Sequence, residues 1–155
     1  MNNLSNNARG GNLCLSKAGL AEGTNAATIK TAAPNGAGID YCIDGIFYHK
    51  ADGDNIAMTA LDAQADDTSC LYLVQINASG TISIKKGDEA LTSEITDGKA
   101  ALQWPDADAD NVAIGGFRID NDGGTFTSGT TDLGAGTVTD TFYDFFAVPP
   151  QGISS

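Results

Sequence analysis

The chain has 155 residues, enough for one domain with a substantial core. Its formal charge of −12 at neutral pH argues against a nucleic-acid partner, because an acidic surface repels phosphate. No apolar run approaches the ~20 residues of a membrane span, and the N-terminus lacks an apolar segment of signal-peptide length, so we expect neither a membrane partner nor Sec export.

The charge is unevenly distributed. Residues 1–30 contain Arg9, Lys17 and Lys30 against Glu22, which gives 3 − 1 = +2. Residues 31–155 contain five Lys/Arg against nineteen Asp/Glu, which gives 5 − 19 = −14. We interpret this as a slightly basic leading segment on an acidic body whose charge keeps the protein soluble.

The first 25 residues are rich in Asn, Gly, Ser and Ala and carry only isolated leucines. Because they lack a periodic apolar face, we predict a flexible N-terminal arm over 1–25, a β body over 26–148 and a C-terminal tail over 149–155. The arm is either a solvated tail or a segment that orders on a partner. In the second interpretation the contacts are made by apolar anchors and two cations: Leu4, Leu13, Leu15, Leu20, Arg9 and Lys17.

Short strands fill the next part of the chain. Residues 27–33 have strand character and end at a Pro-Asn-Gly turn. Residues 39–50 predict two strands around Asp44-Gly45, the dipeptide of a type I′ hairpin turn. A further strand is expected over 55–59, followed by an acidic linker over 61–67.

Residues 68–86 predict the central hairpin. The first half of its leading strand is apolar on both faces, which is typical of a strand inside a sheet. Ala78-Ser79-Gly80 supplies the loop, and residues 81–85 alternate between polar and apolar on the return.

The second half of the chain is less regular. We expect a short strand at 91–95, one helical turn over 99–104 ended by Pro105, and a strand over 111–120 with either a bulge or a close backbone approach at Gly115-Gly116. A turn at 121–124 should start a return strand at 125–127, and 137–148 should form the last strand. Eight to ten short strands with little helix predict a single-domain, all-β, antiparallel sandwich or barrel-like fold.

The sequence carries no catalytic signature. It has one histidine, His49, no G-x-S-x-G elbow and no phosphate-binding P-loop. Its three cysteines, Cys14, Cys42 and Cys70, lack metal-ligand spacing, and we favour buried reduced thiols over disulfide pairing. We therefore predict no enzyme activity, no cofactor and no metal centre.

Acidic loops raise the question of calcium. Asp106, Asp108 and Asp110 alternate as in an EF-hand loop, but Asn111 stands where that loop needs glycine and Phe117 where it needs a bidentate Glu. The EF-hand is thereby excluded. A different calcium site, from these three carboxylates or from Asp120 with Asp122, stays open beside the interpretation as solvated loops.

Four aromatic residues crowd the last strand: Phe142, Tyr143, Phe145 and Phe146. Strand alternation cannot bury all four rings on one face. We expect most of this cluster in the core and part of it at a subunit interface, where aromatic residues are enriched.

Taken together, the Asn/Gly-rich arm, the acidic β body and segments such as GGFRIDNDGGTF and FYDFFAVPP resemble the small head decoration, or cement, proteins of tailed bacteriophages. The resemblance extends over the whole chain in style and rests on no fingerprint motif. It implies a non-enzymatic virion protein, often trimeric, that is made in the host cytoplasm, binds the major capsid protein and stabilises the capsid exterior.

Two other classes remain open. A tail or head-fibre module, or adhesin, that binds host glycan would have a similar composition and would need an exposed aromatic platform, for which Trp104 and Tyr48 are the candidates. An enzyme on a β scaffold would need carboxylates paired with His49 or a metal, and the sequence offers no such set.

Overall fold

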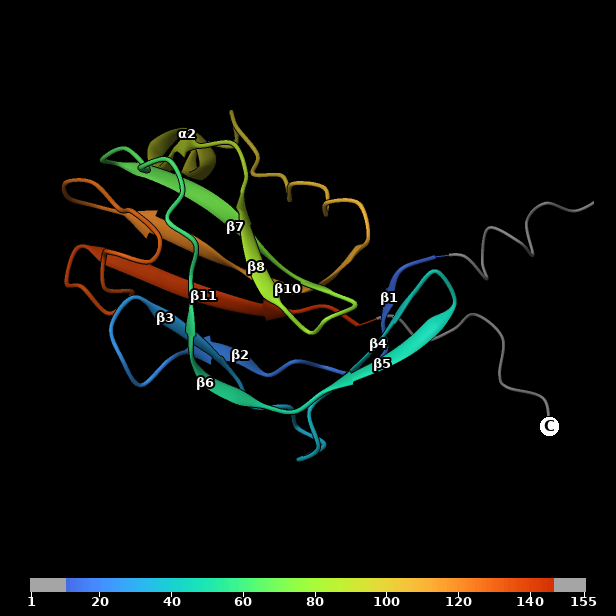
Figure 1. The fold of residues 1–155 in the computed structure, drawn as a ribbon. Helices are drawn as coiled ribbons and strands as arrows, with labels where there is room; N and C mark the ends of the chain where they lie inside the picture. The colour runs from blue at the N-terminus through green and yellow to red at the C-terminus, as the bar shows by residue number, and fades with distance from the viewer. Residues whose placement is uncertain (1–10, 147–155) are drawn as a thin grey trace, which may run out of the picture.

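The computed structural model describes residues 11–146, which form an all-β fold of three antiparallel sheets (Figure 1). The predicted all-β sandwich-like body is confirmed, with eleven strands in the described part of the chain. The one helix among residues 11–146, α2 (Thr92–Thr96), has five residues. Within residues 11–146 no helix is both long and apolar enough to cross a bilayer.

The largest sheet is built on the predicted central hairpin. It contains β7 (Thr68–Asn77), β8 (Ile82–Lys86), β10 (Asn111–Asn121) and β11 (Val138–Asp144) in the order β11-β10-β7-β8, and β9 (Ala90–Leu91) also pairs with β7. Residues 68–76 are all buried, as expected for a strand that is apolar on both faces. The predicted hairpin over 68–86 is confirmed.

The predicted irregularity in the 111–120 strand is also confirmed. The pairing of β10 with β7 shifts between Ala113 and Gly115, which marks a β-bulge. Glycine is required here because neighbouring groups lie against the backbone. A Cβ on Gly115 would lie 2.5 Å from Leu20 Cδ1, and one on Gly116 would lie 2.3 Å from the indole ring of Trp104.

Two three-stranded sheets complete the fold. One has the order β1 (Leu13–Cys14), β4 (Ile39–Ile43), β5 (Ile46–Lys50), and the other β2 (Leu20–Glu22), β3 (Thr28–Thr31), β6 (Gly53–Ala57). Asp44 and Gly45 join β4 to β5 with φ of 50° and 82°, and Ile43 pairs with Ile46. Positive φ at both positions is the signature of the predicted type I′ turn.

One apolar core joins the three sheets. Its largest fully buried side chains include Tyr41 from β4, Ile29 from β3, and Tyr72 and Phe117 from the central sheet. The rings of Tyr72 and Phe117 stack with centroids 5.1 Å apart. All three cysteines are buried and none is paired in a disulfide, as favoured from the sequence.

The predicted flexible arm is wrong for residues 11–25. Leu13 pairs with Cys42 through β1, and Leu20 pairs with Thr31 through β2. β1 and β2 have only two and three residues, and they are stabilised by pairing with other strands. Amino-acid composition alone does not reveal such pairing. Residues 1–10 and 147–155, which include the predicted C-terminal tail, lie outside the described residues.

Two predictions in the second half of the chain are also wrong. Helix α2 stands where a strand was expected over 91–95, and no helix forms over 99–104. The return strand is β11, not 125–127. Instead, Phe126 leaves the turn region, enters the core and forms a two-hydrogen-bond bridge with Gln64.

Candidate interaction surface

The residues predicted to contact a partner through the arm lie in different environments. Leu4 and Arg9 lie outside the described residues. Leu13 and Leu15 are half-buried on the sheet formed by β1, β4 and β5, and Lys17 is exposed just beyond it. Leu20, by contrast, is 7% exposed and packs in the core, so we withdraw it from the contact set.

The four aromatic residues predicted at a subunit interface also lie in different environments. Phe142 packs against the core, with its ring centroid 5.5 Å from that of Phe117, and is withdrawn from the interface. The rings of Tyr143 and Phe145 meet Trp104 edge to face at 5.7 and 5.0 Å. Phe146 is 48% exposed and stands at the end of the chain's described part.

The structure brings the two predicted sets together at Phe146. An open depression of about 230 Å³ lies between this ring and Leu13 of β1, and a second of about 240 Å³ lies between it and Leu15 with Lys17. Segments more than 120 residues apart in the sequence therefore share one surface. We call this surface, formed by Leu13, Leu15, Lys17 and Phe146, the end surface.

The β4–β5 hairpin lies beside β1 (Figure 1) and extends the end surface. Leu13, Cys42 and Phe47 are directly opposite one another in register, so their side chains share one face of the sheet. The opposite face carries Tyr41 and contributes to the core. Phe47 is 74% exposed and Ile46 is 59% exposed, the two highest values among the exposed large hydrophobic residues of the described chain.

Charge separates this end from the rest of the molecule. Residues 11–17 and 38–51 contain Lys17 and Lys50 against Asp40 and Asp44, which gives 2 − 2 = 0 in a chain of net charge −12. His49 Nδ1 lies 2.8 Å from Asp40 Oδ1, with both side chains about half exposed. This end therefore carries no net charge, on a body that is acidic.

Carboxylates gather elsewhere. Glu22, at the end of β2, has a raised pKa because of partial burial and because the charges of Asp140 and Asp132 lie close to it. Asp140 belongs to the first half of β11, which begins at the opposite side of the molecule from β5 in Figure 1. This repulsion between carboxylates thus lies away from the end surface.

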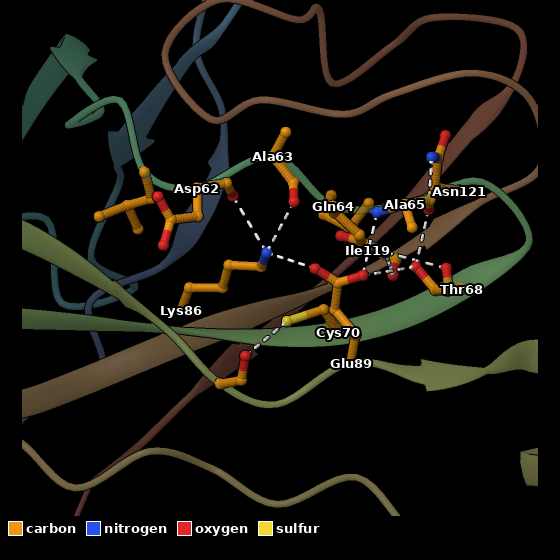
Figure 2. Close-up of polar contacts among 12 residues, drawn as sticks. Asp62, Ala63, Gln64, Ala65, Thr68, Cys70, Lys86, Glu89, Ile119 and Asn121 are labelled. Atoms are coloured by element: carbon orange, nitrogen blue, oxygen red, sulfur yellow. Dashed lines mark hydrogen bonds and ion pairs between the residues drawn. The ribbon is translucent and has the colours of Figure 1, made fainter.

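A polar cluster holds the 61–67 linker (Figure 2). An open depression of about 470 Å³ lies beside it. Lys86 Nζ donates to the carbonyl oxygens of Asp62 and Ala63 at 3.0 Å each and pairs with Glu89. All three donors of the ammonium group are therefore occupied. Burial alone raises the pKa of Glu89, but the Lys86 hydrogen bond and the Ala65 N–H together lower it below its ordinary value.

The same cluster satisfies a buried amide. Gln64 is fully buried, and its Nε2 donates to the carbonyl oxygens of Thr68 and Ile119 at 2.9 and 3.1 Å. The Tyr72 hydroxyl donates to Gln64 Oε1 at 3.1 Å. Because the Lys86 ammonium group, the Glu89 carboxylate and the Gln64 amide each have partners within the protein, we interpret the cluster as an anchor for the linker.

The Cys70 thiol is buried beside this cluster and has low reactivity. Burial raises the pKa of Cys70 to about 11, with Lys86 opposing the shift, and its Sγ donates to the Gly87 carbonyl at 3.3 Å. Thiolate is the reactive form of cysteine, so at neutral pH this residue is a poor nucleophile.

The acidic loops do not converge on a metal ion. Asp108 accepts from Gln75 Nε2 at 2.6 Å and pairs with Lys85 at 2.8 Å, and Asp120 accepts from Arg118 and Ser69. Within residues 11–146 no group of three His, Cys, Asp or Glu side chains is placed to hold a metal. The open calcium interpretation gains no site among the described residues.

The two candidate glycan platforms are packed against other rings. Trp104 lies on Gly116 and is met by the edges of Tyr143 and Phe145. Tyr48 stacks on Tyr41 with centroids 5.5 Å apart. Neither ring stands free on the surface as a stacking platform.

Sequence reasoning missed Ile46 and Phe47 as surface residues. The Asp-Gly turn located the hairpin, but Ile46 and Phe47 lie on opposite faces of β5, and alternation does not show that the rest of the chain leaves both uncovered at the hairpin tip. The signal that was available is the pair of apolar residues directly after the turn.

Comparisons of the chain with protein-family models, with curated proteins and with solved structures find no significant match.

Proposed function

We propose that the chain is a non-enzymatic virion protein that decorates the outside of a bacteriophage capsid by binding the major capsid protein. The observation that supports this most is the gathering of exposed apolar side chains at the neutral end of an acidic molecule. Exposed apolar patches bordered by polar residues are typical of protein–protein interaction sites.

The docking contact in this proposal is the end surface together with residues 1–10. Phe146, Leu15 and the hairpin tip at Phe47 provide apolar contact, and Leu4 and Arg9 precede β1, which starts on the same surface. The acidic remainder of the body faces solvent, where its charge keeps the particle surface hydrated.

The proposal includes a homo-oligomer, for which the resemblance to decoration proteins implies a trimer. Several end surfaces on one oligomer would engage a repeating capsid lattice at the same time. Such multivalent attachment raises avidity without a large contact area for each copy.

The test is co-sedimentation with capsids that lack the protein, prepared from the phage that encodes it. The informative variant is Phe146→Glu, and Leu91→Glu is its matched control, because the two side chains are 48% and 46% exposed and both changes add one negative charge. Leu91 is the last residue of β9 and directly precedes α2, which lies far from β5 in Figure 1.

We expect wild type and Leu91→Glu to sediment with capsids and Phe146→Glu to stay in the supernatant. Binding of Phe146→Glu equal to that of the control would contradict the assigned surface. Failure of the wild type to bind would contradict the proposed function itself.

A further inference from the structure

The β1-β4-β5 sheet has one open edge in the described residues, and a contact at this edge would not depend on capsid binding. The β1 side of this sheet is closed, since β1 lies against β10 and Asn12 Nδ2 donates to the Asn111 carbonyl at 2.8 Å. On the other side, no strand of the described chain pairs with β5. An uncovered edge strand is a template for pairing with another strand.

The register shows which backbone groups of β5 are available. Ile43 and Ile46 flank the two-residue turn and form a hydrogen-bonded pair, so the pairs that follow alternate along the ladder. Tyr48 and Lys50 therefore bond to β4. The N–H and C=O groups of Phe47 and His49 point away from it.

Other edges in the described residues are obstructed. The Lys85–Asp108 ion pair holds the 103–108 segment against β8. Asn55, with φ of 54°, makes β6 irregular. β11 lies beside β2, where Leu20 N–H donates to Asp144 Oδ1 at 3.0 Å. By contrast, β5 has no bulge and no proline, and its first two residues are the exposed Ile46 and Phe47.

We propose that β5 pairs antiparallel with β5 of a second copy across a two-fold axis, joining two three-stranded sheets into one of six strands. A two-fold axis at Tyr48 places Phe47 opposite His49 of the second copy, and the same pair recurs by symmetry. Each such pair exchanges two backbone hydrogen bonds, so the contact has four.

Charge supports a second copy as the occupant. In this register Lys50 is opposite Ile46 of the other chain, so no two like charges face each other within the five residues. The residues at the end that meets its copy have a charge balance of zero, in a chain whose net charge is −12. The pairing leaves Leu13, Leu15 and Phe146 on the face of the sheet and doubles the end surface.

This contact gives two copies, not the three that the resemblance implies, and its test needs no capsid. Sedimentation velocity of the full chain over a roughly hundredfold concentration range should show the mass rising from 15.9 kDa toward twice that value. Association should strengthen as ionic strength rises, because salt screens repulsion between two chains of charge −12.

The critical variant is His49→Pro, which removes one outward N–H donor and leaves the bonds to β4 in place. Its matched control is His49→Val, which also removes the imidazole but keeps the N–H. We expect the Val variant to dimerise and the Pro variant to remain a single chain at every concentration. Dimers of the Pro variant equal to those of the control would overturn the proposal.

Hydrogen exchange of the wild-type protein gives a second readout that does not depend on the folding of a variant. The Phe47 and His49 amides should exchange more slowly as protein concentration rises, while the Ile56 amide of β6 stays unchanged. A mass of one chain throughout, a mass of three chains, or amide exchange that is independent of concentration would each overturn the proposed contact.

Discussion

Replacing Leu20 by alanine tests whether the segment before residue 25 belongs to the folded body. The side chain is 7% exposed and packs over the Gly115 bulge of β10. Truncating a buried leucine to alanine costs about 2–5 kcal/mol, from lost burial and from the cavity that remains. We expect about 3 kcal/mol, because the segment can relax only partly around the missing methyl groups.

The assay is urea unfolding followed by circular dichroism. With a slope of about 2 kcal/mol per molar urea, a loss of 3 kcal/mol lowers the midpoint by roughly 1.5 M. The matched control is Leu91→Ala, a leucine that is 46% exposed, for which we expect a change within about 0.5 kcal/mol. If the two variants had the same midpoint, residues 11–25 would behave as an arm and the described packing would be wrong.

Further predictions concern packing, pH and thiol reactivity. Gly116→Ala should destabilise the fold by about 1–3 kcal/mol in the same urea assay, because its Cβ meets an indole ring, whereas Gly136→Ala, with open space around it, should be neutral. The pKa of Glu89 is lowered in the folded state, so its stabilising contribution is present above about pH 5 and is lost as acid protonates it; urea midpoints of Glu89→Gln should fall less steeply than those of wild type below that pH. Cys14 and Cys70, whose pKa values burial raises to about 11, should resist iodoacetamide at pH 8 until urea unfolds the chain, and rapid labelling of the folded protein would contradict their burial.

Long, strongly patterned elements were predictable from the sequence. The 68–86 hairpin has a leading strand that is apolar on both faces, which identifies a central strand without any knowledge of its neighbours. The Asp44-Gly45 turn was predictable for a different reason, since few dipeptides accept positive φ at two successive positions.

Elements that depend on distant partners were not predictable. β1 has two residues, and it is a strand through its pairing with Cys42 and Tyr41 of β4. The turn after Asn121 suggested an immediate hairpin, but Phe126 gains more by entering the core against Gln64, and the return strand begins only at Val138. Local strand propensity does not show that a long-range contact will win over an immediate hairpin.

The residues of the end surface could be predicted from the sequence, but their arrangement in space could not. The arm leucines and the terminal aromatics were identified separately, and only the fold shows that Leu13, Leu15 and Phe146 share a surface while Leu20 and Phe142 are in the core. Which side of an apolar alternation is covered depends on the packing of other sheets.

The most direct test of the proposed function is an electron cryo-microscopy reconstruction of capsids decorated with this protein. We expect density in which the β1-β4-β5 end, with Leu15 and Phe146, contacts the capsid shell and the carboxylates of Glu22 and Asp140 face solvent. Density in the reverse orientation, or undecorated particles at saturating protein, would contradict this expectation.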